Sequence, residues 1–242
     1  ELSDVARQVS TDPSLTADLL KTVNSAAFML PKRVDNIVEA VKLVGLRNLR
    51  QLLYSTGTQK ILGDDTPETR DLWEQSYRSA FYAYQIAKGL ARNRDILDDV
   101  YVGGILHDMG KIIFSSVHPD LTSKIEKFCE AHDMPTKLFE DLSGGVNHAE
   151  IGAMIAEKWN FPVPLVNAIR YHHDPTSAPI GDRDVVYAVY LAAALCDYRV
   201  AGVAFDRLEP RVLREYNIET PDQLHGIEER MGEAFEREMA KQ

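Results

Sequence analysis

Four of the seven histidines are of a type and spacing that could hold a metal ion or move a proton. His107 is followed at once by Asp108, His148 stands alone in a later segment, and His172 and His173 are adjacent. Imidazole nitrogens and carboxylate oxygens together suit divalent iron, manganese, nickel or zinc. A metal held there would activate water or polarise a phosphoryl oxygen. These residues are therefore candidate metal ligands.

Two further residues extend this candidate site. Lys111 follows His107 by four residues, so a continuous helix would place both on one face, with the ammonium group available to an anionic phosphate. Asp197 lies in the apolar run 191–197, where a buried charge is costly unless it is paired or bound to a metal.

Each signal also has a purely structural explanation. A single histidine-aspartate pair is more often a surface pair or a helix-end hydrogen bond, and His172 and His173 could simply complement the dipole at the end of a helix. Only the occurrence of several such signals in one chain favours a site. Such a site requires several helices to bring distant residues together.

The composition limits the class of protein. Among 242 residues, 27 are Lys or Arg and 37 are Asp or Glu, which gives a formal net charge of −10. This excess of acid argues against broad attraction to nucleic acid or to an anionic membrane. No apolar run approaches the ~18 residues of a membrane helix. Cys129 and Cys196 both lie in apolar stretches, which excludes a disulfide scaffold and predicts a cytoplasmic location.

Helical periodicity runs through nearly the whole chain and predicts an all-α fold. Over 73–91 apolar residues recur every three or four positions, which is typical of a buried helix. Gly45 separates two short apolar stripes, and the polar stretch 57–66 predicts a loop between an N-terminal lobe and a larger body. The other expected helices span 13–27, 37–44, 46–53, 97–114, 119–132, 136–142, 149–159, 163–171, 182–200, 210–216 and 221–239.

Several runs in the chain resemble a known family. The runs LHDMGK at 106–111, HAEIG at 148–152 and HH at 172–173 resemble the HD superfamily of metal-dependent phosphohydrolases. The runs LLKTVNSAAF at 19–28 and IVEAVKLVGLRNLR at 37–50 are similar to the HD-related output domain, HDOD, found in bacterial signalling proteins. The resemblance extends from about residue 2 to about residue 202.

The resemblance implies a multi-helix HD-like bundle with a smaller N-terminal helical lobe. It implies an HDOD-like domain over 1–202, with the lobe at 1–60 and the helical core at 67–202. Residues 203–242 would form a C-terminal helical extension packed on the same domain.

The resemblance also implies roles for individual residues. The implied metal ligands are His107, Asp108, His148, His172, His173 and Asp197, and Asp108 and Lys111 would be catalytic if the chain is an enzyme. The first histidine of the superfamily motif is missing, and Gln75, a neutral and poorer ligand, stands in its place. The glycine-tyrosine-proline signature of the cyclic di-GMP phosphodiesterase branch is replaced by DPTSAP at 174–179.

These departures favour a non-catalytic regulatory module that retains a metal site. HDOD members are regarded as having lost hydrolase activity and as regulatory modules coupled to cyclic di-GMP or two-component proteins, so signalling proteins are the expected partners. The alternative is a metal-dependent phosphohydrolase or phosphodiesterase acting on a nucleotide or cyclic dinucleotide, with one or two metals bound. The net acidity counts mildly against an anionic substrate.

A weaker alternative is DNA binding by the N-terminal lobe. The segment 37–53 resembles a helix-turn-helix, whose second helix would turn Arg47, Asn48 and Arg50 towards a major groove. Helix packing with basic residues on a solvated face explains the same segment. Residues 32–50 carry five basic residues against two acidic ones, a local charge of 5 − 2 = +3: Lys32, Arg33, Lys42, Arg47 and Arg50 against Asp35 and Glu39.

Overall fold

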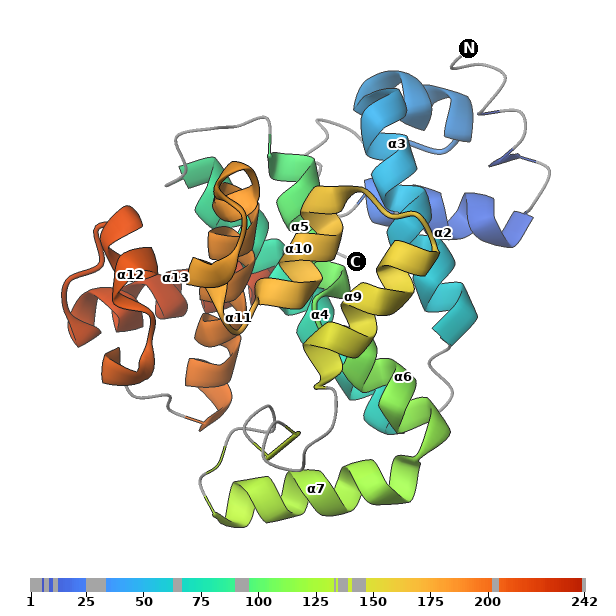
Figure 1. Ribbon diagram of the computed structural model, residues 1–242. Coiled ribbons are helices and arrows are strands. Elements are labelled where there is room, and N and C mark those ends of the chain that lie inside the picture. The colour runs from blue at the N-terminus through green and yellow to red at the C-terminus, as the bar shows by residue number, and fades with distance from the viewer. Residues whose placement is uncertain are drawn as a thin grey trace. The chain divides into compact units, whose positions relative to one another are not determined.

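The regular structure of this chain is helical wherever a computed structural model describes it (Figure 1). The described residues are 6, 9–10, 13–24, 34–62, 67–89, 96–132, 134, 139–140, 147–201 and 205–240. The prediction of an all-α fold is therefore confirmed. The chain divides into two compact units, one made of 1–61 with 229–242 and the other of 62–228.

The N-terminal unit contains α2 (Pro13–Val23) and α3 (Ile37–Leu62). Gly45 interrupts α3 with φ +80° and ψ 166°, which confirms the predicted break between two helices at this glycine. The second helix runs on to Leu62, so the loop predicted over 57–62 is wrong, and 63–66 lie outside the described residues. The polar residues there tolerate helix because propensity is a weak constraint beside tertiary contacts.

Asn24 ties α2 to the segment before α3. Its amide nitrogen donates to the carbonyl oxygens of Leu20 and Val34, each at 2.8 Å, and its amide oxygen accepts from the Val34 backbone nitrogen at 2.8 Å. The basic side chains behind the DNA-binding alternative receive no structural description, except for Lys42, which is exposed.

The larger unit holds the site. Its helices are α4 (Pro67–Gly89), α5 (Leu97–Leu106), α6 (Met109–Val117), α7 (Pro119–Ala131), α9 (His148–Lys158), α10 (Val163–Tyr171), α11 (Arg183–Ala201) and α12 (Pro210–Glu215), with short 3₁₀ turns at Pro175–Ser177, Ile180–Asp182 and Phe205–Arg207. The division between the units passes through α13 (Pro221–Met239). The domain boundaries expected from the resemblance, including the extension over 203–242, stay a prediction.

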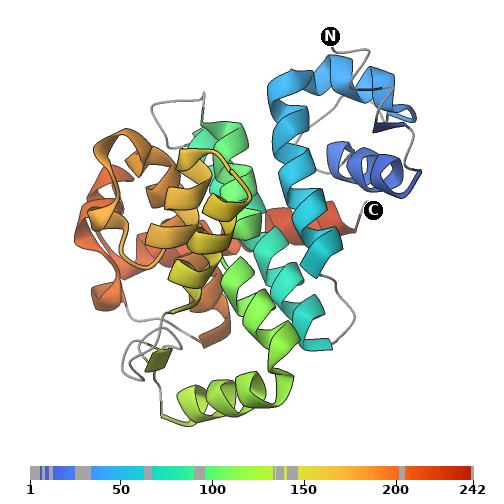
Figure 2. The same ribbon diagram turned by 45° about the vertical axis from the view of Figure 1, so that its right-hand side comes forward.

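The centre of the larger unit is the contact of α5 with α4, α10 and α11. Eight of the ten residues of α5 are buried. Gly104 allows α4 to approach closely, since a Cβ there would lie 2.6 Å from the Ala80 Cα. α9 and α10 lie side by side in both views, and α6 leads into α7 (Figure 1, Figure 2).

One predicted helix is broken in two. The apolar pattern predicts a single helix over 97–114, but α5 ends at Leu106 and α6 begins at Met109. Asp108 leaves the helical conformation with φ −98° and ψ 14°. The break places His107 and Asp108 at a junction between two helices, where both side chains can face the same interior space.

The remaining helix predictions agree with the structure to within a few residues, except at two places. Most of 136–142 and the end of the predicted helix 13–27 lie outside the described residues, although 139–140 are helical. None of the helices in the described ranges combines the length and hydropathy that crossing a lipid bilayer requires.

Candidate metal centre

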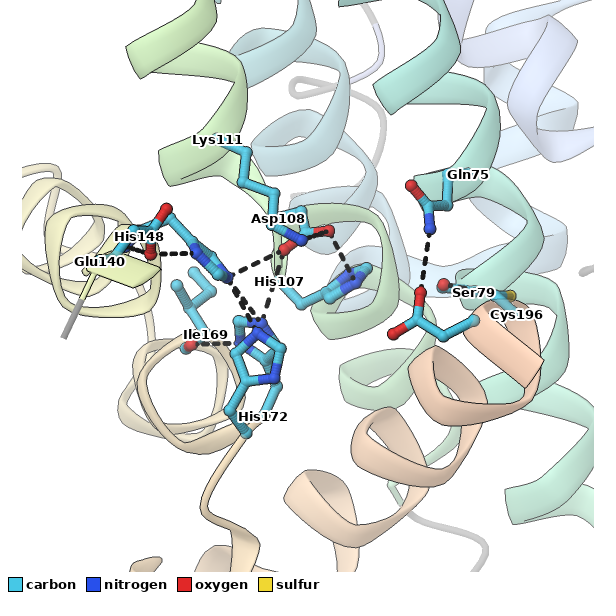
Figure 3. A network of polar contacts seen from close by, with 12 residues as sticks. Gln75, Ser79, His107, Asp108, Lys111, Glu140, His148, Ile169, His172 and Cys196 are labelled. Carbon is cyan, nitrogen blue, oxygen red and sulfur yellow. Dashed lines mark hydrogen bonds and ion pairs between the residues drawn. The ribbon is translucent and has the colours of Figure 1, made fainter. Parts of the chain in front are cut away.

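Four side chains from three places in the larger unit meet at one point (Figure 3). Asp108 comes from the α5–α6 junction, His148 is the first residue of α9, and His172 and His173 directly follow α10. One ligand atom from each lies within 4.8 Å of the others. The structure thus brings together four of the six predicted ligands, and their binding of metal stays a prediction.

The distances define a compact donor set. Asp108 Oδ1 lies 3.4 Å from His148 Nε2 and 3.5 Å from His172 Nε2. His148 Nε2 in turn lies 3.4 Å from His172 Nε2 and 2.9 Å from His173 Nε2. Asp108, His148 and His172 are buried, whereas His173 is partly exposed.

The rings of His148 and His172 each make a hydrogen bond through Nδ1, the nitrogen that points away from the donor set. These hydrogen bonds leave Nε2 of each ring facing the donor set. His148 Nδ1 lies 2.7 Å from a Glu140 carboxylate oxygen, and His172 Nδ1 lies 2.7 Å from the Ile169 carbonyl oxygen. Both oxygens can only accept while Glu140 is ionised, so each Nδ1 carries the proton and each Nε2 presents a lone pair. Two lone pairs 3.4 Å apart do not form a hydrogen bond.

The donor atoms that face this point are therefore not all satisfied by one another. Asp108 Oδ1 is buried and has no hydrogen-bond partner among the described residues. A proton on His173 Nε2 can serve one lone pair of His148, but it leaves His172 Nε2 and Asp108 Oδ1 facing each other. A divalent cation bound by three imidazoles and one carboxylate would satisfy all four atoms, so these residues fit a transition metal.

The protonation states agree with this interpretation. Burial lowers the pKa of His107 and of His148 to about 4, and burial also lowers the pKa of His173. Burial alone would raise the pKa of Asp108, but the Lys111 ammonium and the nearby histidines hold that pKa well below its usual range. At neutral pH His148 and His173 are thus neutral and Asp108 is ionised, the forms that bind metal.

Figure 3 shows His107 and Gln75 on the other side of Asp108 from His148 and His172. His107 Nε2 lies 3.4 Å from Asp108 Oδ2, and its Nδ1 lies 2.7 Å from the Gly104 carbonyl oxygen. Gln75 Nε2 donates to Asp197 Oδ1 at 3.3 Å. His107 and Asp197 do not belong to the four-residue cluster.

Two expectations about this side of the site need correction. The apolar run around Asp197 predicts a buried carboxylate, but the residue is exposed. It lies where α11 packs against α4, and its carboxylate accepts a hydrogen bond from Gln75 there. The shared helical face of Lys111 and His107 requires a continuous helix, and the helix breaks between them. Lys111 instead contacts the site through Asp108, since its Nζ donates to Asp108 Oδ2 at 3.0 Å.

Sequence reasoning did not find Glu140 as part of this site. Its carboxylate contacts both the backbone and the ring of His148. It lies eight residues before His148, outside every motif that the sequence indicated, and a lone glutamate carries no signal of its own.

Gly110 lets α6 approach α9 at the site. A Cβ there would overlap the carbonyl oxygen of His148 and lie 3.1 Å from the Gly152 nitrogen. Gly110→Ala should lower the free energy of unfolding by about 3 kcal/mol, because the clash is with backbone that cannot rotate away. Urea unfolding measures the change, and Gly181→Ala, where a Cβ meets nothing within 4 Å, is the control. Equal stability of the two variants would contradict this account of the α6–α9 contact.

Comparisons with known proteins agree with this fold. The family model of the HDOD domain matches residues 1–175. An uncharacterized protein from Treponema pallidum is 34% identical over 238 residues, which cover 98% of this chain and 46% of that protein. The chain therefore spans about half the length of this relative. A ribonuclease Y from Thermus thermophilus is 36% identical over 63 residues, 26% of this chain and 10% of the enzyme.

Solved structures share the architecture at low sequence identity. A candidate signal transduction protein from Marinobacter aquaeolei has a TM-score of 0.73 at 22% identity, with 98% of this chain and 53% of that chain covered. A candidate phosphohydrolase from Shewanella amazonensis has a TM-score of 0.72 at 23% identity, with 96% and 83% covered. At these identities the likeness is one of fold. Since the family model matches well over half of its residues, this chain belongs to the HDOD domain family.

Proposed function

We propose that this chain is a regulatory module of bacterial signalling that binds one divalent metal ion and does not hydrolyse phosphate esters. The proposal depends on one observation about the two sides of Asp108. On one side, Asp108 and three histidines form a compact set of metal donors. On the other side, Gln75 donates a hydrogen bond to Asp197. The first side fits a metal ion. On the second side an amide stands where the superfamily has a histidine ligand.

The size of the donor set supports a non-catalytic role. A tetrahedral ion such as zinc is saturated by four protein ligands, whereas catalytic zinc sites keep one position open for water. Asp108, His148, His172 and His173 supply four. When bound, a metal with open positions would supply an activated water, so six-coordinate manganese or iron is the ion with which residual hydrolysis should be sought.

Hydrolysis of a nucleotide or cyclic dinucleotide is the second candidate function. It is supported by Lys111, whose Nζ lies beside Asp108 and whose pKa the Asp108 and Asp197 carboxylates raise against the effect of burial. A protonated lysine beside a metal site can stabilise phosphate charge. Its hydrogen bond to Asp108, however, already uses one of its protons.

The proposed partners are signalling proteins or attached signalling domains in the cytoplasm, including those that respond to cyclic di-GMP. Support comes from membership of the HDOD family and from the signal transduction protein that shares the fold. Cys129 and Cys196 are buried free thiols, which suit a reducing compartment.

Phosphodiesterase assays test the non-catalytic role. With zinc, manganese or iron added, the full chain is expected to release no product above background from bis-p-nitrophenyl phosphate or cyclic di-GMP. The reason is that Gln75 replaces a histidine that would help to hold a second metal ion on the Asp197 side of Asp108. Turnover that rises with protein concentration and disappears in Asp108→Ala would overturn the proposal and establish the hydrolase. Turnover that survives in Asp108→Ala would indicate a contaminating enzyme.

A further inference from the structure

Glu140 contacts His148 through two hydrogen bonds (Figure 3). The same carboxylate oxygen, Oε2, accepts from the backbone nitrogen of His148 at 2.9 Å and from its ring Nδ1 at 2.7 Å. The glutamate lies in a short helical piece at 139–140, between α7 and α9. Its hydrogen bonds therefore link a separate segment to the first residue of α9.

His148 needs this outside partner because of its place in its helix. The rings of His107 and His172 are held by carbonyl oxygens three residues earlier, at Gly104 and Ile169, each at the end of the preceding helix. His148 instead begins α9, so no helical turn precedes it to offer such a carbonyl. Its ring orientation depends on a side chain from elsewhere.

A carboxylate in this position does more than orient the ring. Accepting the Nδ1 proton selects the tautomer with a free Nε2 lone pair, and a charged acceptor makes that lone pair more basic.

The position of Glu140 is itself held by an aromatic contact. Phe139, the preceding residue, packs against Phe128 of α7 with ring centroids 5.6 Å apart. Phe128 also stacks on His132 at 4.2 Å. A short series of contacts therefore runs from α7 through Phe139 and Glu140 to the ring of His148.

We propose that Glu140 is a positioning residue of the metal centre, which fixes the tautomer and orientation of His148 and is itself placed by the Phe128–Phe139 contact. This inference rests on the proposed metal site. It assigns a role to a residue outside the implied ligand set, and it makes α7 part of the framework on which metal affinity depends.

The test compares Glu140→Gln with Glu157→Gln in the full chain. Glu157 lies on α9, nine residues after His148, where it is exposed, pairs with Arg170 and is outside the donor set. Zinc affinity should fall about 10- to 100-fold in Glu140→Gln and stay unchanged in Glu157→Gln, because the neutral amide is a weaker acceptor. Glu140→Asp, which keeps the charge on a shorter side chain, should recover part of the affinity, and Phe139→Ala should weaken binding in the same direction.

Nitrogen NMR of the histidines in the metal-free chain gives a readout that a general loss of stability would not produce. In the unchanged chain His148 should hold its proton on Nδ1, and in Glu140→Gln it should shift towards a mixture of tautomers. Unchanged zinc affinity together with an unchanged tautomer would overturn the role of Glu140. If the unchanged chain binds no zinc, the metal site itself is refuted, and the tautomer experiment still decides whether Glu140 positions His148. If Glu140→Gln does not fold, Glu140→Asp supplies both measurements.

Discussion

His172→Ala should reduce the affinity of the chain for zinc by about a hundredfold and leave purified protein nearly free of metal. Four ligands hold structural zinc with roughly 10–16 kcal/mol, so one of four accounts for about 3 kcal/mol, or about a hundredfold in affinity. The His172 ring is fully buried and its Nε2 lies in the donor set. Elemental analysis of the purified protein and competition with a chelating dye measure the change.

His225→Ala is the matched control for this experiment. His225 is exposed on α13 and is outside the donor cluster, so its loss should not alter metal content. The unchanged chain should carry close to one metal ion. Absence of metal from the unchanged chain after purification without chelators and after zinc addition, with the fold intact, would refute the metal centre.

Gln75→His should allow a second metal ion to bind. Gln75 lies on α4 within hydrogen-bond distance of Asp197, and His107 lies near the second oxygen of Asp108. An imidazole at position 75 would complete a set of two histidines and two carboxylates in which Asp108 is shared. The expected result is a rise from about one to about two metal ions per chain, measured by elemental analysis at saturating manganese or iron.

Gln75→Leu separates the new ligand from the loss of the old hydrogen bond. It removes the contact with Asp197 without adding a donor, so its metal content should equal that of the unchanged chain. A second ion in both variants would mean that the Gln75–Asp197 hydrogen bond was the obstacle. No second ion in Gln75→His would mean that position 75 does not face the site. Phosphodiesterase turnover in Gln75→His alone would link the missing histidine to the missing activity.

Local pattern was sufficient for most of the helices. Gly45 predicted a break that the structure has, because a residue with φ near +80° interrupts a helix and glycine adopts that conformation without steric cost. The pattern was insufficient at 97–114 and at 57–62. In the first segment the apolar periodicity continues across the break between α5 and α6. In the second segment polar residues continue a helix.

The candidate site shows the same division. Residue types alone predicted donors that suit a transition metal, and the missing histidine at Gln75 was evident from the motif. The sequence did not show which donors share a centre. Periodicity indicates which face of its own helix a side chain occupies, but it does not indicate how the helices pack. That packing separated His107 and Asp197 from the cluster of four.

The sequence by itself therefore determined that this chain is helical, that it resembles the HDOD domain family and that it carries side chains of the types that suit a metal ion. The tertiary structure decided that Asp108 meets His148, His172 and His173, that Gln75 meets Asp197, and that Glu140 holds a ring in place. The physical reason is the range of each interaction. Helix formation depends on neighbours three and four residues away, whereas a donor set depends on close helix crossings between segments tens of residues apart, such as the α6–α9 contact permitted by Gly110.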